Sequence, residues 1–447
     1  MNDSSKAGSD RLQNLLQRRQ RLLGNAYRLF YDQPVHIVSG EGVWLYDSDG
    51  KKYLDVYNNV PHVGHCHPHV VEAIFKQSQR LNTHTRYLHE LVLDYAERLT
   101  GKFPEGLDIA MFACSGTEAN ELALRLARAK TGATGMIVTE HAYHGTSWAI
   151  AQITTCYGSG EKRGDNIVTV PTPDSYRGLY AGDEQAAERY AAHLENAIET
   201  LADRGLRPAA FIVDTIFSNE GLPTVPPGYL GKAVEVVRRA GGLFVADEVQ
   251  PGFGRLGTHF WGFEKHGVKP DIATMGKPMG NGYPISAVVT SSAVVDAFTR
   301  QSHYFNTFGG TPVACAAALA VLDVIEQQGL QAAALETGNF LLAGLKEMAE
   351  NQPLIGDIRG SGMFIGIDLV RDRESRQPAT EEANKAVNLL RQEGVLIGST
   401  GQYDNVLKIR PPMVFSKEHA DFLLQKFETV LEKAGNRHNT VPGNQFP

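Results

Sequence analysis

Two short segments contain a carboxylate and an amine that could act together on a cofactor. Val245-Ala-Asp-Glu-Val-Gln250 ends a buried apolar strand in acidic residues, and Lys277 follows a second short strand among glycines. Asp247 and Lys277 at neighbouring strand ends suit pyridoxal phosphate: the amine binds the aldehyde as a Schiff base, and the carboxylate keeps the pyridine nitrogen protonated so that the ring accepts electrons. A surface lysine and an acidic helix cap are the alternative interpretation.

A turn that could hold the phosphate of such a cofactor precedes a helix-forming run. Ser115-Gly-Thr117 places small residues directly before Glu118 to Lys130. Hydroxyl residues and glycine at a helix N-terminus offer free backbone N–H groups and the positive end of the helix dipole, where phosphate binds. Simple N-capping would explain the same pattern. The nearby lysine and aspartate signals favour a phosphate cradle formed by Ser115, Gly116 and Thr117.

Two further turns contain candidate cofactor contacts. His141-Ala-Tyr-His-Gly145 follows a predicted strand, so Tyr143 could stack on the pyridine ring; ordinary packing of Tyr143 and His144 at a strand end is the alternative. In Asn306-Thr-Phe-Gly-Gly310, Thr307 could donate to a phosphate or serve only the turn.

Two other patterns are set aside. His65-Cys-His-Pro-His69 resembles a metal cluster, but no further ligands follow at helical or zinc-finger spacing, so we expect no metal. Gly360-Ser-Gly362 with Gly366 resembles a dinucleotide fingerprint, yet it leads into a strand instead of opening a helix.

The elements that must position these residues alternate between strand and helix. Short β-like runs occur at 135–140, 209–214, 242–249, 272–275 and 285–290, with helical stretches at 118–130, 183–204 and 228–240 between several of them. This alternation predicts an α/β domain on a mostly parallel sheet, with its ligand at the carboxyl ends of the strands. Asp247 and Lys277 each fall at such an end.

The chain outside this alternating region predicts a smaller α+β domain built from both termini. We expect four segments: residues 1–59 as a helix (11–30) and meander, 60–328 as the large domain, 329–435 as the C-terminal α+β domain, and 436–447 as a loose tail.

Composition limits the function classes. The chain has 447 residues, 42% of them hydrophobic, and a formal net charge of −7, which disfavours nucleic-acid and anionic-membrane partners. Its four cysteines have no paired metal spacing, which fits free thiols in a reducing cytosol. No apolar run reaches the ~20 residues of a membrane span, and the N-terminal residues lack an apolar signal-peptide core. A cytoplasmic protein is expected.

Taken in order, these motifs resemble class III aminotransferases, over nearly the whole chain from about Tyr31 to Phe427. The resemblance implies a fold-type I homodimer with active sites shared at the subunit interface. It also implies that Lys277 binds pyridoxal phosphate, Asp247 pairs with the pyridine nitrogen and Thr307 reaches the phosphate from the neighbouring subunit. The full set of candidate cofactor contacts is Ser115, Gly116, Thr117, Tyr143 on the ring, His144, Asp247, Gln250 on the ring hydroxyl, Lys277 and Thr307.

Within that family, the segments at 58–68, 81–89, 304–310 and 407–413 are similar to the phospho-lyase branch, which eliminates phosphate and ammonia from phosphorylated amino alcohols. Many class III transaminases place an arginine against the substrate carboxylate where this chain has Lys408. Arginine's planar fork fits a carboxylate, whereas lysine is a point charge, and phosphoethanolamine has no carboxylate. Arg410 lies nearby, and a small register shift would restore an arginine. Candidate substrate contacts are Asn59, His62, Arg86, Lys408 and Arg410.

The resemblance therefore implies a lyase that converts phosphoethanolamine to acetaldehyde, ammonia and phosphate. An omega-amino-acid or alanine–glyoxylate-type transaminase is the main alternative, because it shares every cofactor residue. A non-catalytic cofactor carrier is a third reading, which the presence of both Lys277 and Asp247 disfavours. The Asp214–Glu220 segment departs from the Glu-Pro start common in transaminases, so no role is carried over to Glu220.

Overall fold

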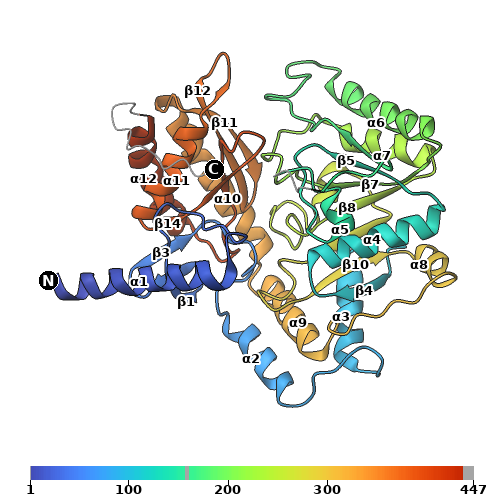
Figure 1. Ribbon diagram of the computed structural model, residues 1–447, viewed down its shortest axis with the longest axis horizontal. Helices are drawn as coiled ribbons and strands as arrows, with labels where there is room; N and C mark the ends of the chain where they lie inside the picture. Colours follow the sequence, from blue (N-terminus) through green and yellow to red (C-terminus); the bar gives the residue numbers. More distant parts are fainter. Residues whose placement is uncertain (1, 157–160, 436–447) are drawn as a thin grey trace.

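The computed structural model describes residues 2–156 and 161–435; the expected loose tail at 436–447 lies outside them. A large α/β region is built on a seven-stranded sheet, and two smaller sheets lie beside it (Figure 1). In Figure 1 the N-terminal strands lie next to the C-terminal helices, on the opposite side of the molecule from the seven-stranded sheet.

The large sheet has the order β4-β10-β9-β8-β7-β5-β6 and is parallel except for β10, which runs antiparallel to both of its neighbours. The mostly parallel α/β fold predicted from the sequence is thereby confirmed. The strands are β4 (Ile109–Ala113), β5 (Gly135–Thr139), β6 (Ile167–Val170), β7 (Pro208–Asp214), β8 (Leu243–Asp247), β9 (Ile272–Met275) and β10 (Ser286–Thr290).

Helices cover both faces of this sheet, which explains why its central strands are almost wholly apolar. Alternate residues of β7 enter different cores: Phe211 faces the side of α6 and α7, whereas Ile212 faces the side of α4. The helices of the large region, not all of which contact the sheet, are α2 (Pro68–Ser78), α3 (Glu90–Thr100), α4 (Gly116–Thr131), α5 (Trp148–Ala151), α6 (Ala186–Asp203), α7 (Tyr229–Arg239), the 3-10 helix η1 (Gly262–His266), α8 (Ser292–Thr299) and α9 (Pro312–Gln327).

The register of the central strands places three polar residues side by side at their carboxyl ends. Asp214 of β7 is opposite Asp247 of β8, and Asp247 is opposite Thr274 of β9. Lys277 follows the end of β9 at the same edge. The parallel sheet therefore brings together residues that are far apart in sequence, as expected for a ligand site at this edge.

The two smaller sheets combine segments from both ends of the chain. One has the order β1-β2-β3-β14, and the other β11-β12-β16-β15, with β13 pairing β12. The parallel β3·β14 pair joins the N-terminal meander to the C-terminal part. The elements are α1 (Asn2–Leu23), β1 (Ile37–Glu41), β2 (Trp44–Asp47), β3 (Lys52–Asp55), α10 (Leu330–Asn351), β11 (Ile355–Ser361), β12 (Phe364–Asp372), β13 (Gln377–Pro378), α11 (Thr380–Gln392), β14 (Val395–Leu396), β15 (Gly398–Thr400), β16 (Val406–Ile409) and α12 (Lys417–Gly435).

Several elements differ from those expected. Helix α1 ends at Leu23, where Gly24 has a left-handed φ of 63°, so the helix expected over 11–30 is wrong at its C-terminal end. The edge strands β4 and β6, helix α10 and strand β11 were not predicted. Among the described residues no single helix is long and apolar enough to cross a membrane; α9 and α10 meet that requirement only together, as a pair bent by 61°.

Candidate active site

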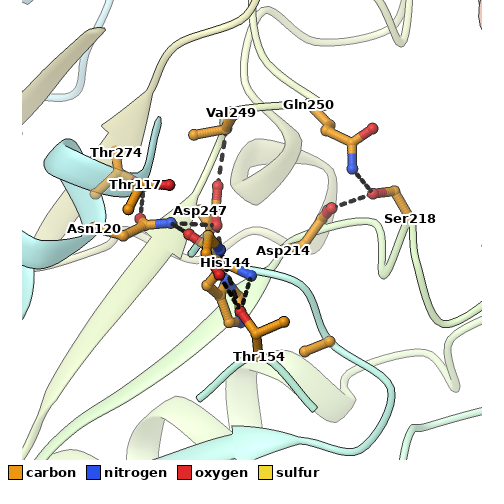
Figure 2. A network of polar contacts seen from close by, with 12 residues as sticks. Thr117, Asn120, His144, Thr154, Asp214, Ser218, Asp247, Val249, Gln250 and Thr274 are labelled. Atoms are coloured by element: carbon orange, nitrogen blue, oxygen red, sulfur yellow. Dashed lines mark hydrogen bonds and ion pairs between the residues drawn. The ribbon is translucent and has the colours of Figure 1, made fainter. Parts of the chain in front are cut away.

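The Asp247 carboxylate is held by groups from three elements (Figure 2). Its Oδ2 accepts hydrogen bonds from Asn120 Nδ2 (2.9 Å) and bonds His144 Nδ1 (2.7 Å), and its Oδ1 accepts from the Val249 backbone N–H (3.1 Å). Asn120 is held in turn by Thr274, whose Oγ1 donates to Asn120 Oδ1 (2.6 Å). A buried charge fixed in this way presents its remaining oxygen lone pairs in one direction.

His144 completes this network as an ion-pair partner of Asp247. Burial lowers the pKa of His144, but the hydrogen bond and charge of Asp247 outweigh it, so the pKa is raised overall. The backbone of the same turn is fixed by Thr154, whose Oγ1 donates to Gly145 O (2.8 Å) and accepts from the N–H of His144 (3.2 Å). His144 therefore helps to fix the position of the Asp247 carboxylate.

The turn predicted to hold the phosphate has two backbone amides with no acceptor among the described residues. Ser115 is the N-cap of α4, and a capping box uses both its Oγ, which accepts from Glu118 N, and its own N–H, which donates to Glu118 Oε2 (3.0 Å). The first N–H groups of a helix have no intrahelical acceptor, and those of Gly116 and Thr117 stay available. Ser115 thus shapes the turn while the next two residues can bind an anion.

Close packing around this turn requires glycine. A Cβ on Gly145, whose φ is 136°, would lie 2.4 Å from Thr117 Oγ1, and a Cβ on Gly116 would lie 3.0 Å from Val249 Cγ1. Any larger residue at 145 would displace Thr117. The shape of the predicted phosphate cradle therefore depends on glycine at positions 116 and 145.

Lys277 is partly buried just beyond β9. Burial lowers the pKa of its amine below the ordinary value, Arg410 lowers it further, and the charge of Asp247 partly opposes the change. A lysine with a lowered pKa can act as nucleophile and base near neutral pH. Tyr143 is half-buried in the same area, where burial first and then the charges of Cys156 and Asp247 raise the pKa of its hydroxyl.

Gln250 lies at the centre of a second polar chain. Its Nε2 donates to Ser218 Oγ (2.5 Å), and Ser218 Oγ donates to Asp214. Its Oε1 accepts from Arg410 Nη1 (2.7 Å) and Asn59 Nδ2 (3.3 Å). Because an arginine only donates, these partners fix which end of the Gln250 amide carries oxygen. Two candidate substrate residues, Asn59 and Arg410, thereby contact a candidate cofactor residue.

Lys408 enters the site from the smaller part of the molecule. It lies on β16 between two glycines, Gly366 and Gly398, and only 3% of its surface is exposed. Burial lowers the pKa of its amine well below the ordinary value; Arg410 and Lys277 lower it further, whereas Asp214 and Glu220 raise it. Among the described residues its ammonium makes neither a hydrogen bond nor a direct ion pair. Its Nζ lies over the Phe364 ring at 5.6 Å. An anion bound beside this amine would favour its charged form and oppose the lowering of its pKa.

Two glutamates lie under the site. Glu220 Oε1 accepts from Thr139 Oγ1 (2.8 Å), while Oε2 is buried with no hydrogen-bond partner among the described residues, and burial with the nearby Asp214 raises the pKa to about 7. Glu248 accepts from Gly262 N (2.7 Å) and Phe263 N (2.9 Å), and burial raises its pKa to about 8. Glu248 therefore secures a loop, whereas Glu220 faces the charged cluster.

Both ring nitrogens of His62 are engaged by other described residues. Its Nδ1 faces Arg255 Nη2 (3.2 Å), a donor, so its Nε2–H donates to Phe253 O (2.8 Å). Burial and the charge of Arg255 lower the pKa of His62 well below its usual range, which keeps the ring neutral. In the structure His62 holds the buried Arg255, and its contact with a substrate stays a prediction.

Arg86 and Thr307 lie outside this cluster. Both are exposed, and the Arg86 guanidinium stacks over Phe305 at 3.9 Å from the ring centroid. The side chain of Thr307 makes no hydrogen bond to the part of the chain that the structure describes. The structure thus separates these two residues from Lys277 within one chain.

Sequence reasoning missed Asn120, Thr154, Asp214, Ser218 and Thr274. Asn120 carried a readable signal, because asparagine is unfavourable inside a helix and its position lies on the buried face of α4. The residues at 65–69 form no metal cluster: His65 bonds Asp55 (2.7 Å) while His69 bonds Asp323 (3.0 Å). Across the described ranges, no group of three or more His, Cys, Asp or Glu side chains could hold a metal ion.

The residues present fit pyridoxal phosphate. Two free amides at a helix N-terminus suit its phosphate, the fixed Asp247 carboxylate suits a protonated ring nitrogen, and Lys277 supplies the amine. On the edge of a mostly parallel seven-stranded sheet, this arrangement defines a fold-type I enzyme that uses pyridoxal phosphate.

The comparisons with known proteins agree. The model of the family "Aminotransferase class-III" matches residues 29–431, so the chain belongs to the class III aminotransferases. It is 43% identical to a Drosophila melanogaster alanine–glyoxylate aminotransferase 2-like protein (92% of this chain, 86% of the relative). It is 38% identical to the Caenorhabditis elegans ethanolamine-phosphate phospho-lyase homolog 1 (94% and 93%). A solved structure of an Arthrobacter phospholyase in complex with phosphoethanolamine superimposes with a TM-score of 0.91 at 45% identity (94% and 99%).

Proposed function

We propose that this protein is a phospho-lyase that converts phosphoethanolamine and water to acetaldehyde, ammonia and phosphate. The observation that carries the proposal is Lys408: a buried lysine, close to Arg410 and Lys277, that has no direct anionic partner in the described chain. The phosphoethanolamine complex of the Arthrobacter relative supports this choice of substrate.

The charges of the site favour a phosphate over a carboxylate. Lysine provides a point charge with three donors, whereas recognition of a carboxylate is typically bidentate and uses arginine. Arg410 has one Nη engaged by Gln250 and its guanidinium stacked on Tyr57 at 4.4 Å, so its orientation is already set. Lys408 and Arg410 together supply the positive charge that a phosphate requires.

The chain's own residues divide the reaction between them. Pyridoxal phosphate, when bound, supplies an electron sink for breaking the Cα–H bond. Lys277 takes the Cα proton, which its lowered pKa permits, while Asp247 with His144 holds a proton at the ring nitrogen. Lys408 and Arg410 stabilise the charge that develops on phosphate as the Cβ–O bond breaks. Hydrolysis of the remaining two-carbon fragment gives acetaldehyde and ammonia.

A transaminase of the alanine–glyoxylate type is the second candidate. Its support comes from the relatives: besides the Drosophila protein, a human alanine–glyoxylate aminotransferase 2 is 35% identical over 427 residues. It would use the same cofactor residues, with Arg410 in contact with the substrate carboxylate.

A second copy of the chain would complete the site. Tyr87, Leu88, Phe305 and Phe308 are exposed, Leu88 to 97%, and the rings of Tyr87 and Phe305 both pack against His84. Thr307 lies between Phe305 and Phe308 in the chain. Exposed apolar groups gathered in this way mark an interaction surface. We therefore include in the proposal a homodimer in which Thr307 reaches the cofactor phosphate of the neighbouring subunit. Sedimentation of Leu88→Asp as a monomer, with weakened cofactor binding, would support it; an unchanged dimer would contradict it.

The deciding experiment supplies phosphoethanolamine without any keto acid. Equimolar phosphate and ammonia, absent with Lys277→Ala, establish the lyase. If no phosphate is released from phosphoethanolamine or from phosphohydroxylysine, while amino donors are converted with pyruvate or glyoxylate, the transaminase is the correct function. The folded state of Lys277→Ala is checked by its thermal unfolding.

A further inference from the structure

The loop of residues 215–222, between β7 and the segment leading to α7, has a constrained backbone. Phe217 and Leu222 have φ values of 53° and 51°, and Gly221 has 106°. Bulky residues adopt this left-handed conformation only where the surroundings impose it. Both Phe217 and Leu222 are buried.

The contacts that impose this backbone come from the C-terminal part of the chain. Arg359 of β11 donates to Gly221 O (2.8 Å) and Leu222 O (2.7 Å). Thr400 at the end of β15 donates from Oγ1 to the carbonyls of Ser218 and Asn219, each at 3.2 Å. The loop's carbonyls therefore face the smaller sheets.

Arg359 is itself rigidly placed. Its Nη2 pairs with Asp368 Oδ2 (3.1 Å) and its Nη1 with Asp357 Oδ2 (2.8 Å), while Asp368 Oδ1 accepts from Asn405 Nδ2 (2.7 Å). Only 8% of the Arg359 surface is exposed. A buried arginine whose three guanidinium nitrogens are all engaged is held in one orientation and can clamp the loop.

The side chains on the other side of the loop face the cofactor site. Ser218 Oγ donates to Asp214 and accepts from Gln250 Nε2 (2.5 Å), as Figure 2 shows. With Nε2 directed at Ser218, Oε1 is directed at Arg410. Ser218 and Arg410 thus set the orientation of the Gln250 amide together.

We propose that Arg359 and Thr400 are positioning residues: they hold the 215–222 loop so that Ser218 orients Gln250 toward the cofactor. Through these two residues, the position of the smaller sheets determines how the Gln250 amide is oriented beside the cofactor ring. The inference rests on the cofactor site of the proposed function but not on the choice between phosphate elimination and transamination. The result of the phosphate-release assay therefore does not depend on this inference, and either proposal can fail without the other.

The test compares Arg359→Lys and Thr400→Val with two reference variants. Ser218→Ala removes the link to Gln250 but keeps the contacts of Arg359 and Thr400. Arg371→Lys alters an ion pair between β12 of the same sheet and helix α11, Arg371–Glu382 (2.8 Å), which includes no residue of the loop. Hydrogen exchange of the 215–222 amides is measured on cofactor-free protein. The pH dependence of the visible absorption is measured on the holoenzyme.

Arg359→Lys and Thr400→Val are expected to speed exchange of the loop amides about tenfold while β8 amides stay unchanged. Both variants, and Ser218→Ala, are expected to shift the midpoint of the absorption titration by about half a pH unit or more. Arg371→Lys changes neither.

Loop exchange equal to wild type in the clamp variants would overturn the inference, as would faster exchange with an unchanged titration midpoint. If Arg359→Lys does not fold, Thr400→Val decides alone by the same two criteria.

Discussion

The two sides of the cofactor site are built differently. The Asp247 side is formed by β8, α4 and the turn at His144, all within the large α/β region, and its buried carboxylate oxygens are engaged by Asn120, His144 and Val249. The Lys408 side brings β16 of a smaller sheet close to Asp214 at the end of β7. Among the described residues the Lys408 amine makes no hydrogen bond or ion pair, and its Nζ lies over the Phe364 ring at 5.6 Å. On the Asp247 side the polar groups satisfy one another, whereas on the Lys408 side a bound substrate would supply the missing partner.

This difference matches the chemistry that each side must perform. A proton held at a ring nitrogen is needed throughout a reaction, so a preorganised carboxylate is favoured there. In the proposed lyase a phosphate leaving group must bind and depart, so its site would gain from a basic side chain that is fully satisfied only when phosphate is present. Changes on the first side should therefore affect catalysis in general, and changes on the second should affect substrate choice.

The largest effect is expected for Asp247→Asn. The amide cannot hold a proton at the ring nitrogen, and His144 loses its ion pair. We expect kcat to fall about 10³-fold, equivalent to about 4 kcal/mol, for any substrate. Steady-state kinetics test this, with Asp271→Asn, a more exposed carboxylate paired with Arg238 (3.2 Å), as the control. Equal losses in both variants would contradict a special role of Asp247.

Lys408→Met should have the next largest effect and should be selective. We expect kcat/KM for phosphoethanolamine to fall about 100-fold, or about 3 kcal/mol, with cofactor binding retained. Lys408→Arg should lose elimination less and gain activity toward carboxylate-bearing amines. Lys426→Met, at a surface pair with Glu393 (3.0 Å), is the control. A loss of cofactor binding in Lys408→Met would remove the distinction between the two sides.

Asn120→Ala tests, through the stability of the protein, whether the Asp247 side is a rigid network. Loss of the bonds to His144 O (2.7 Å) and Asp247 leaves buried groups unsatisfied. We expect a loss of about 2–3 kcal/mol in the free energy of unfolding, measured by denaturant titration of cofactor-free protein. The exposed helical position Asn196→Ala should change stability by less than about 0.5 kcal/mol. Similar values for both would show that the network is not rigid.

Glu220→Gln should show a pH-dependent gain. The pKa of Glu220 is raised to about 7, so between its unfolded value and pH 7 the folded state binds more protons than the unfolded state. Wild-type stability therefore falls as pH rises through this range. The variant should match wild type near pH 5 and exceed it at pH 8 by on the order of 2 kcal/mol. Thermal unfolding at both pH values checks this, with Glu195→Gln as control; a pH-independent difference would contradict it.

The sequence predicted the central strands and the chemistry at their ends for a physical reason. Strands buried on both faces, such as β7 and β8, are continuous apolar runs, and their polar ends are conspicuous. The edge strands β4 and β6 are half-exposed and lack that contrast. Helix α10 likewise lacks a sharp contrast between an apolar run and a polar end, and it was not predicted from the sequence.

The remaining parts of the site depend on contacts that no local pattern contains. Gln250 was identified from its motif, but its amide orientation is set by Ser218 and Arg410, which come from other segments. His62 stood in a promising motif, yet the buried Arg255 uses its free nitrogen. Family resemblance supplied residue types, and only the fold supplied their partners.

The parallel pairing of β3 with β14 has a consequence for biosynthesis. Val395 and Leu396 pair with Leu54 and Asp55, which are translated hundreds of residues earlier. At roughly 5–20 residues per second, β3 waits on the order of half a minute for its neighbour while the α/β region can already fold. Until then its edge is open to other nascent chains, so ribosome-associated chaperones would be needed most during the interval between synthesis of β3 and of β14.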